Sequence, residues 1–517
     1  MLRHCLSKQQ QFQRQKQQPM LHRRLFLKTA ATAISIASFT LGTTSSAFST
    51  SDLRARSYHY TRNSEQLRHP FYYNSSNNNT RNRMILSSAS ISHSEKSNTT
   101  KSNMTSENHS QNNNNTNNTQ VVAKRVSATP SSLQACGERL RNGELVSFPT
   151  ETVYGLGCHA LDPDAVHKVF AAKRRPLTDP LIVHVVSPAD ACQLWKVKTT
   201  IHDESNNNGS PMMQKQALMA LMDEFWPGPL TIIAQAHECV PPIVTAGTGF
   251  VAARCPSHPI ARALIETAGI PIAAPSANRF GHVSPTRADH VLSDLGGEDV
   301  WVVDVDVDVT GDTPAAADDD DHANTNTNTI CNVGVESTVA KVDDVEGTVS
   351  VLRHGAVSPV AIQNCLRYAG LADQFRVQIC IRTTGEEVAN VAPGQTIKHY
   401  SPDVPSFIIS QKRFTKLLLL NDDEKEFVRK AVVLDFGGQL SWLQKDCLAY
   451  RDLSVTGDSS EAAMRVFDSL RWSELIEGAE RVYFPELVVE GESDALALAV
   501  KDRLTRAASG VIIEKFQ

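Results

Sequence analysis

SFPTETVYGLG occupies Ser147–Gly157, and no other stretch of the chain constrains the fold as strongly. Hydroxyl side chains and a Gly-x-Gly pair follow a short apolar strand here, so a permissive turn would let backbone N–H groups face a ligand. Two segments complete the pattern: Lys173–Pro176 (KRRP) adds cations at a helix end, and Pro275–Asn278 (PSAN) follows an apolar strand at 270–274. Because ligands of α/β sheets bind where strands end, the three segments together predict an anion-binding site for a nucleotide.

Composition separates a non-globular leader from a folded remainder. The chain has 517 residues, room for two or three domains, but 63–118 is dominated by Asn, Ser and Thr. Such a segment has too few apolar residues to offset the entropy of ordering, so disorder is expected. The net charge of −5 gives no overall nucleic-acid or membrane signal. Ten scattered cysteines without a CxxC pair favour buried thiols in a reduced compartment over a zinc site.

The first part of the leader is typical of a targeting peptide. His22-Arg23-Arg24 precedes an apolar run at 25–41, and several arginines follow with few acids. Ser45-Ser46-Ala47-Phe48 is similar to the cleavage motif of bipartite plastid leaders. We therefore expect an organellar protein with a transit peptide, with plastid ahead of mitochondrion, whose mature form contacts no membrane. The alternative is a cytoplasmic protein with an uncleaved disordered tail.

From Val121 onward strands alternate with helices, which predicts an α/β fold. Leu145–Phe148 is an apolar strand, and Asp162-Pro163 is an N-cap followed by a first-turn proline, which predicts a helix start. The apolar face of that helix should carry Lys173 and Arg175 away from the core, exposed to solvent or a ligand. Further strands are predicted at 181–186, 230–234, 250–254, 270–274 and 301–305, and further helices at 218–225, 260–268 and 286–295.

Polar segments divide the rest of the chain. Residues 203–212 and 304–329 are expected to be insertions; the second contains Asp318–Asp321, which lacks the glycine turns and terminal Glu of a calcium loop. Residues 1–120 are assigned to the leader and disordered region. A first α/β domain is predicted at 121–384, a linker or lid at 385–405, and a second, smaller α/β domain at 406–517. The second domain should contain strands at 432–436 and 481–484 and helices at 461–470 and 494–508.

Eight motifs follow one another in a specific order. They are PTETVYGLG (149–157), KRRP (173–176), PLIVH (180–184), FWPGPLT (225–231), PSHP (256–259), APSAN (274–278), GVEST (334–338) and a PG-HY-P linker. This ordered set resembles the long form of the YrdC family, the threonylcarbamoyl-adenylate synthases, and is far more specific than any single motif. The resemblance implies a YrdC-like twisted mixed sheet with a concave basic groove, plus a smaller C-terminal α/β Rossmann-like domain.

The same resemblance implies an activity and its partners. The family members are nucleotidyltransferases that join L-threonine, bicarbonate and ATP into threonylcarbamoyl-AMP and release pyrophosphate. The product would supply a downstream threonylcarbamoyl transferase that modifies tRNA. Mg²⁺ would arrive with ATP, without a dedicated protein metal site. A weak contact with RNA is also expected.

Site residues follow from the resemblance, position by position. Lys173 and Arg175 would be catalytic, because cations must absorb the charge of a carbamate approaching the α-phosphate. The ATP contacts would be Arg175, Asp179, Ser276, Asn278, Ser284 and Arg353. The threonine contacts would be Thr150, His184, Arg254, Ala274 and Ser337. His399 and Tyr400 would form a lid. No residue stands out as a general base.

Several of these residues also have a purely structural interpretation. Lys173–Arg175 could be a basic helix end favoured by the helix dipole, and His184 could be a satisfied core histidine. Ser284 and Thr286 could cap a helix beginning at Arg287, and Asn278 could be a turn residue. Gly155-x-Gly157 is not a dinucleotide fingerprint, because Thr150–Thr152 separates the strand from the glycines. The chain also has no P-loop motif.

Five positions depart from the family pattern. Asp179 stands where Asn or His is common, which would place an anion near the phosphates. Phe250 replaces a frequent Thr, Ile397 replaces an aromatic residue of the linker, and Cys331-Asn332 replaces a glycine-rich approach to GVEST.

A second class of function stays open. The alternative is a noncatalytic module of the same fold that binds double-stranded RNA or associates with the ribosome. Net charge and the lack of an RRM, KH or aromatic stacking motif weigh against it. Carbamoyl transfer, as in hydrogenase-maturation relatives, would require acylphosphatase-like and zinc-finger segments that the sequence does not show.

Overall fold

The computed structural model describes residues 122–196, 210–305, 331–381, 387–394, 399–415 and 420–517. The expected leader and disordered region at 1–120 lie outside the described residues. The expected insertions at 203–212 and 304–329 lie mostly outside them, and so do Ile397 and other parts of the expected linker.

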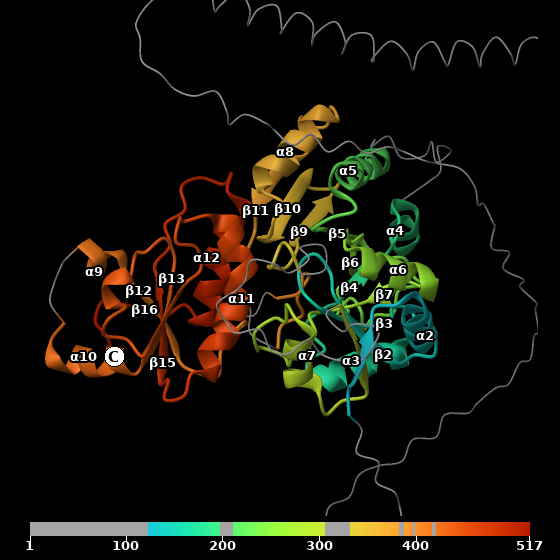
Figure 1. The fold of residues 1–517 in the computed structure, drawn as a ribbon. Coiled ribbons are helices and arrows are strands. Elements are labelled where there is room, and N and C mark those ends of the chain that lie inside the picture. The colour runs from blue at the N-terminus through green and yellow to red at the C-terminus, as the bar shows by residue number, and fades with distance from the viewer. Residues whose placement is uncertain (1–121, 197–209, 306–330, 382–386, 395–398, 416–419) are drawn as a thin grey trace, which may run out of the picture. The chain divides into compact units, whose positions relative to one another are not determined.

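A large mixed sheet forms the first part of the described chain (Figure 1). The sheet contains parallel pairs such as β4–β6 and β5–β9 and antiparallel pairs such as β2–β3 and β9–β10. Its eleven strands run in the order β1 (Lys124–Ser127), β8 (Val300–Asp304), β2 (Leu145–Phe148), β3 (Gly155–His159), β7 (Ile272–Ala273), β4 (Ile182–His184), β6 (Phe250–Arg254), β5 (Leu230–Gln235), β9 (Thr338–Asp343), β10 (Thr348–Arg353) and β11 (Arg376–Ile379).

Helices connect these strands, and most begin with a side-chain cap and a proline. The bounds are α2 (Pro130–Arg141), α3 (Pro163–Lys173), α4 (Pro188–Leu194), α5 (Ser210–Phe225), α6 (Pro259–Ala268), α7 (Ala288–Leu295) and α8 (Pro359–Tyr368). The predicted start of α3 is confirmed: the Asp162 side chain accepts a hydrogen bond from the Asp164 N–H, and Pro163 stands in the first turn. α5 ends at Phe225, directly before the Trp-Pro-Gly-Pro segment predicted to stop it.

The Gly-x-Gly pair of the opening motif does not form the expected turn. Gly155 and Gly157 lie inside β3, which pairs with β2. A Cβ on Gly157 would lie 2.7 Å from a ring carbon of Phe148 and 2.9 Å from the Ile272 side chain. Glycine is therefore required here by close packing of neighbouring strands rather than by a turn conformation.

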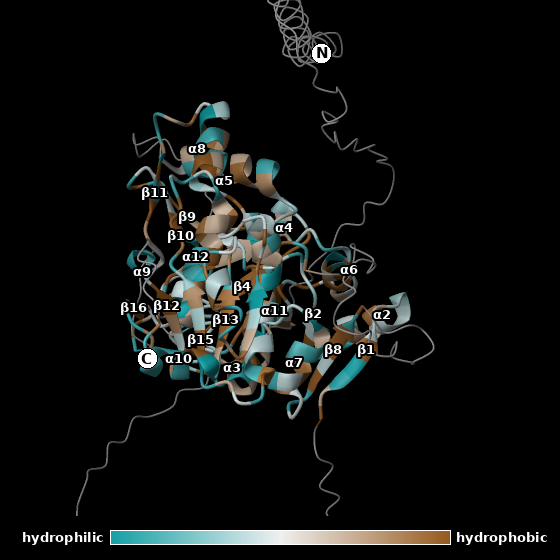
Figure 2. Ribbon diagram, turned by 60° about the vertical axis from the view of Figure 1, so that its left-hand side comes forward, coloured by the Kyte–Doolittle hydropathy of each residue, from teal (hydrophilic) through white to brown (hydrophobic). Residues whose placement is uncertain are grey.

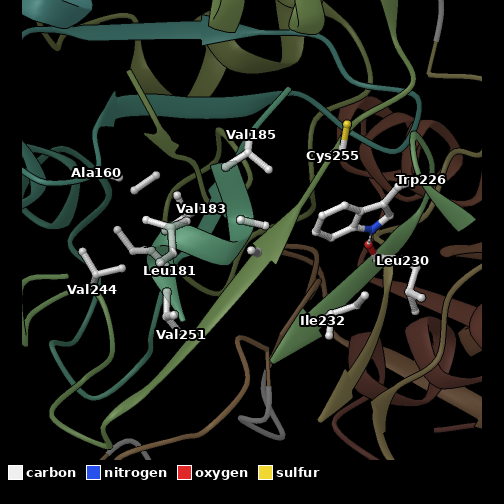
Figure 3. Packing of buried hydrophobic residues seen from close by; sticks show 14 of the residues in the cluster. Ala160, Leu181, Val183, Val185, Trp226, Leu230, Ile232, Val244, Val251 and Cys255 are labelled. Carbon is white, nitrogen blue, oxygen red and sulfur yellow. Dashed lines mark hydrogen bonds between the residues drawn. The ribbon is translucent and has the colours of Figure 1, made fainter. Parts of the chain in front are cut away.

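The main core packs under the central strands. Leu181, Val183 and Val185 interleave with Val244 and Val251 (Figure 3). The Trp226 indole packs beside Leu230 and Ile232 in the same cluster. Its N–H is buried and donates a hydrogen bond to the Leu230 carbonyl at 2.7 Å, so this polar group is satisfied. This packing fixes β4 and β6, the strands that carry His184 and Arg254.

A separate five-stranded parallel sheet forms the C-terminal region. Its strands run in the order β14 (Ala449–Asp452), β13 (Ala431–Asp435), β15 (Arg481–Pro485), β12 (Ser406–Ile409) and β16 (Ile512–Ile513). α11 (Ser459–Leu475) and α12 (Ala495–Ala507) lie on one side, α9 (Gln411–Thr415) and α10 (Asp422–Arg429) on the other, and the short helix η1 (Ser441–Leu443) follows β13 (Figure 1). The predicted strands and helices of this region are confirmed within one or two residues at most ends, although α11 runs five residues past its predicted end.

Hydropathy follows this layering, with apolar strands such as β13 and β15 between helices of mixed polarity (Figure 2). The α/β prediction is therefore confirmed as a large mixed sheet plus a separate parallel sheet. Among the described helices, none is long and apolar enough to cross a membrane.

Candidate active site

One pocket collects most of the predicted site residues. Its wall includes Thr150, Arg175, His184, Arg254, Ala274, Ser276, Ser337, Arg353, His399 and Tyr400. Lys173, Asp179, Asn278 and Ser284 do not line the pocket but contact residues in or beside its wall. The wall is built by the β2–β3 connection, the chain after α3, the ends of β4, β6 and β7, the start of β9, the end of β10, and the residue pairs Pro393-Gly394 and His399-Tyr400.

Arg175 is buried, contrary to the expected exposure. Arg174 ends α3 in the left-handed conformation, with φ 53°, and turns the chain back across the sheet. The Arg175 guanidinium then donates to the carbonyls of Asp179 at 3.1 Å and Pro180 at 2.8 Å. These contacts fix one edge of the guanidinium, and Arg175 lines the pocket. The helix-end pattern correctly placed the charge, but did not reveal the fold-back that buries it.

Lys173 is also buried, with 1% of its surface exposed, so the prediction of an exposed lysine is wrong. Its ammonium donates to the backbone carbonyls of Ser276, at 2.6 Å, and of Asn278. Burial and the neighbouring Arg175 hold the pKa of Lys173 well below its usual value. The side chain therefore ties the end of α3 to the loop after β7, a role that simple helix-dipole capping does not describe.

Asp179 lies behind the wall rather than among open phosphate contacts. Its carboxylate forms an ion pair with Arg175 at 2.9 Å and accepts from the Gly394 N–H at 3.4 Å. Burial raises the pKa of Asp179, and the Arg175 charge opposes that rise. The anion that replaces the family's usual neutral residue is thus paired to an arginine, which removes the expected clash with phosphates.

A second buried ion pair stands at the end of β6. Arg254 and Glu151 are each 4% exposed and lie 2.7 Å apart. Arg254 also donates to the Thr152 hydroxyl at 2.9 Å. Burial alone would raise the pKa of Glu151, but the Arg254 charge outweighs it and lowers that pKa. The Thr150 hydroxyl bonds to Thr152 at 2.8 Å and so completes this polar corner of the pocket.

His184 is neutral and only partly satisfied. Burial, followed by the nearby Arg254 charge, lowers the pKa of His184 to about 3. Its Nδ1 atom has no hydrogen-bond partner among the described residues, and the side chain lines the pocket. His184 is therefore a buried histidine, as the core interpretation expects, with one ring nitrogen left for a further partner.

Arg353 and Ser337 form another part of the wall. Arg353 donates to the Ser337 carbonyl at 3.0 Å and to its hydroxyl at 3.1 Å. The Ser337 hydroxyl also bonds to Thr231 at 2.7 Å. Burial lowers the pKa of Arg353, yet within the described part of the chain no carboxylate pairs with it. Arg353 is therefore a buried cation without a direct ion pair among the described residues, although the nearby Glu336 charge partly opposes the effect of burial on its pKa.

The loop after β7 contains the remaining predicted nucleotide contacts. The Asn278 amide donates to the carbonyls of Arg279 at 2.7 Å and His282 at 2.9 Å, so the turn-residue interpretation describes its amide group well. Its Oδ1 is buried without a described partner. Ser284 does not cap α7, whose N-cap Arg287 makes no side-chain cap bond. The Ser284 hydroxyl donates instead to Glu336, at 2.5 Å.

His399 and Tyr400 close one side of the pocket. Tyr400 is fully buried with φ 61°, an uncommon backbone conformation for a bulky residue, so its surroundings must hold it there. Its ring packs 5.3 Å from that of Phe467 in α11. Burial raises the pKa of Tyr400 to about 12 and holds that of His399 well below its usual value, so both side chains are neutral.

Unpartnered polar atoms point to a ligand. His184 Nδ1, His399 Nδ1 and the Tyr400 hydroxyl are buried without a described hydrogen-bond partner, and all three residues line the pocket. Native proteins rarely leave such atoms unpaired unless a ligand or water completes them. The pocket has a volume of about 50 Å³, and its lining includes Pro393, Gly394, His399 and Tyr400.

Sequence reasoning missed some residues of this pocket. Thr152 and Glu151 lie within the opening motif and could have been chosen as the hydroxyl and carboxylate beside Thr150. Glu336 stands next to Ser337 in GVEST and lines the pocket. Arg503 lies in none of the sequence motifs. Its contact with Glu336 joins residues 167 positions apart, so no local pattern indicates it.

A possible cation-binding group lies elsewhere. Within the described chain, His282, Asp403 and Glu474 bring ligand atoms within 4.8 Å of one another. None of the three lines the pocket. His282 is already hydrogen-bonded to Asp294 and Glu474, both at 2.9 Å. The cluster therefore acts as a contact between the two sheet regions.

Comparison with known proteins identifies the family. The Sua5–YciO–YrdC model, described as "Telomere recombination", matches residues 138–316, and the model described as "Threonylcarbamoyl-AMP synthase, C-terminal domain" matches 357–509. The threonylcarbamoyl-AMP synthase of Bacillus subtilis is 33% identical over 411 residues, which cover 76% of this chain and 97% of the relative. The chain belongs to the Sua5/YrdC family.

Other family members agree over most of the chain. The Pyrococcus abyssi threonylcarbamoyl-AMP synthase is 33% identical over 379 residues, covering 72% of this chain and 93% of the relative. The structure of Pyrococcus abyssi Sua5 complexed with L-threonine is 30% identical with a TM-score of 0.57, over 76% of this chain and 98% of that chain. A variant of the same Sua5 with a neighbouring histidine and tyrosine replaced by alanine also has a TM-score of 0.57, at 27% identity and the same coverage.

Proposed function

We propose that the chain is a threonylcarbamoyl-AMP synthase that joins L-threonine, bicarbonate and ATP and releases pyrophosphate. One observation carries the assignment beyond family membership. Arg175, Arg254 and Arg353 line a single pocket although they come from distant segments. The carboxylates that pair with the first two lie behind the wall, and Arg353 forms no described ion pair. A pocket with this charge arrangement favours substrates that carry several negative charges.

The threonine end is assigned to the corner around Arg254. Arg254 is held by Glu151 and Thr152, so its planar guanidinium is oriented before a carboxylate arrives. The unpartnered His184 Nδ1 is a neutral hydrogen-bonding group for the substrate. Thr150, Ala274 and Ser337 complete the wall of this subsite. The L-threonine complex of the Pyrococcus abyssi protein supports a threonine site in this fold.

The nucleotide end is assigned to the wall formed by Arg175, Ser276 and Arg353, with Asn278 and Ser284 beside it. Asp179 and Lys173 position other groups of the site. Asp179 holds Arg175 through an ion pair, and Lys173 holds the carbonyls of the Ser276–Asn278 loop. Lys173 therefore supports the phosphate contacts through the backbone that carries them. This differs from a lysine that reaches into open solvent toward ATP.

The reaction needs orientation and charge more than a dedicated base. The threonine nitrogen attacks the bicarbonate carbon, water is lost, and a carbamate forms. A carbamate oxygen then forms a bond to the α-phosphorus while the bond from that phosphorus to the bridging oxygen breaks, and pyrophosphate leaves with the electron pair. Fixed arginines stabilise the negative charge that this step concentrates. Holding the two anions together supplies the rest of the rate enhancement.

Magnesium is expected to arrive with the nucleotide. Glu336 is the carboxylate in the described lining, and its oxygens already accept hydrogen bonds from Ser284 and Arg503. The lining therefore offers no spare carboxylate for a protein-held Mg²⁺, and no step is assigned to a protein-bound metal.

The finer organisation is proposed on the same grounds. A catalytic domain at 121–384 with a concave basic groove would be followed by a linker at 385–405 and a Rossmann-like domain at 406–517. His399 and Tyr400 would open and close the pocket as a lid. The leader would direct the chain to an organelle, with plastid ahead of mitochondrion. A fluorescent reporter fused to residues 1–70 that stays in the cytosol would contradict this localisation.

The decisive experiment uses the full chain with ATP, Mg²⁺, L-threonine and bicarbonate. Pyrophosphate release should require both threonine and bicarbonate, and mass spectrometry should detect threonylcarbamoyl-AMP. Reactions that lack one substrate at a time are the controls. A folded protein that binds ATP but forms no mixed anhydride would contradict the proposal. Salt-sensitive RNA binding by such a protein would then favour the noncatalytic alternative.

A further inference from the structure

The C-terminal region places one arginine against the pocket wall. Arg503, on α12, is fully buried. Its guanidinium contacts the Glu336 carboxylate through Nε at 3.1 Å and Nη2 at 2.9 Å. Glu336 in turn lines the pocket. An arginine from the five-stranded sheet region thus neutralises a carboxylate of the catalytic wall.

The same guanidinium fixes two further groups. Its Nη1 donates to the His354 carbonyl at 2.7 Å, directly after Arg353 in the chain. Its carbon lies 5.4 Å from the centre of the Tyr400 ring, within cation–π range. Burial alone would lower the pKa of Arg503, but the surrounding Tyr400, Glu336 and Asp502 outweigh it and raise that pKa. Arg503 is therefore a permanent cation among residues of the pocket wall.

The charge of Glu336 makes this contact functional. Without Arg503, a buried carboxylate in the wall would face the phosphates of ATP, or it would take up a proton and lose its fixed acceptor geometry. Ser284, a predicted ATP contact, donates to the other Glu336 oxygen at 2.5 Å and would lose its orientation. Lysine could not replace the planar fork that contacts both a carboxylate and a carbonyl.

We propose that Arg503 is a positioning residue for ATP binding, supplied by the C-terminal region. It neutralises Glu336 and holds Glu336, Ser284 and Tyr400 in the arrangement that accepts the nucleotide. The C-terminal region is then part of the active site rather than an independent module. This inference rests on the proposed synthase activity, and it assigns that region a specific contribution to the site.

The experiment measures full-chain kinetics in Arg503→Gln and Arg503→Lys, with ATP and threonine varied separately. We expect the KM for ATP to rise at least about ten-fold in Arg503→Gln, while the KM for threonine changes less than about two-fold. Arg503→Lys should recover only part of the loss. Equilibrium binding of ATP without threonine should weaken in parallel, which gives a readout independent of turnover.

Two matched controls separate positioning from simple docking of the regions. Arg471→Gln removes another buried arginine that joins the regions, since Arg471 on α11 pairs with Asp294 at 3.0 Å without contacting a lining carboxylate. It should lower the melting temperature and leave the KM for ATP unchanged. Lys501→Gln changes an exposed cation on α12 and should alter neither quantity.

A rescue variant addresses the charge argument directly. Arg503→Gln/Glu336→Gln removes the uncompensated anion and should restore ATP binding to within about three-fold of wild type, although Ser284 keeps only a neutral acceptor. If Arg503→Gln folds and binds ATP like wild type, or if Arg471→Gln raises the KM for ATP equally, the proposal is wrong. If wild type itself makes no product, the synthase assignment fails instead, so the two failures are distinguishable.

Discussion

Replacing Lys173 by methionine tests whether this cation acts on ATP or on the protein's own backbone. The lysine is buried, and its ammonium donates to the carbonyls of Ser276 and Asn278. Methionine keeps most of the apolar stem and removes only the charged donor. We expect the protein to fold, to be less stable, and to lose activity because the loop after β7 is no longer fixed.

The magnitude follows from the two lost hydrogen bonds. A bond involving a charged group contributes about 1.5–3 kcal/mol, and burial of the ammonium offsets part of that gain, so about 3 kcal/mol is expected for the pair. For a domain of about 150–250 residues, a loss of about 3 kcal/mol lowers the melting temperature by about 6–12 °C. A displacement of the Ser276–Asn278 loop by about 1 Å would reduce turnover about 100-fold.

The assay combines thermal unfolding with pyrophosphate release. Lys168→Met is the matched control, because Lys168 lies on the exposed face of the same helix and donates to the Gly143 carbonyl at 2.8 Å. It should cost less than about 1 kcal/mol and leave turnover unchanged. If Lys173→Met melts within about 2 °C of wild type, the ammonium does not hold the loop as described. If stability falls but turnover does not, the loop does not position the nucleotide.

Three further predictions concern other parts of the site. Arg254→Gln leaves Glu151 as a buried unpaired carboxylate. We expect the KM for threonine to rise about 30-fold, with little change in the KM for ATP. Separate titrations of the two substrates measure both values. Hydrogen bonds to Asp294 and Glu474 overcome the effect of burial and raise the pKa of His282 to about 9, so its contribution to stability is fully present below about pH 6.5 and lost as the pH rises through 9. Between pH 6 and pH 9.5 the melting temperature of wild type should therefore fall more than that of His282→Gln. Equal falls would show that His282 is not the source of this pH dependence. Tyr400→Phe removes a hydroxyl without a described partner, so the melting temperature should hold or rise slightly, and a drop in activity would identify that hydroxyl as a substrate contact; a marked fall in melting temperature would contradict the burial argument.

Local signals explain which parts of the fold were predictable. Asp162-Pro163 defines the start of α3 because an N-cap and a first-turn proline act within one turn of helix. The same signal, Thr129-Pro130, opens α2. Short strands such as β1 and β11 escaped prediction because their stability comes from pairing with distant strands, and little of it is visible in four residues.

Tertiary contacts explain the errors at the site. Helical periodicity predicted that Lys173 and Arg175 would be exposed, but α3 ends at Lys173, and exposure depends on what the chain does next. The left-handed turn at Arg174 sends it back across the sheet, and the loop after β7 covers Lys173. A periodicity argument contains no information about that loop, because the two segments are about 100 residues apart.

The buried charges show how the site is prepared for anions. Arg175, Arg254 and Arg503 each pair with a carboxylate, and each carboxylate is itself nearly or fully buried. Such pairs add little to stability, because desolvation offsets their attraction. They do fix guanidinium groups in place, so substrates meet donors that have already lost their rotational freedom. Arg353 then supplies positive charge without a described carboxylate partner. Because Arg503 lies on α12, the pair with Glu336 forms only when the C-terminal region contacts the pocket wall.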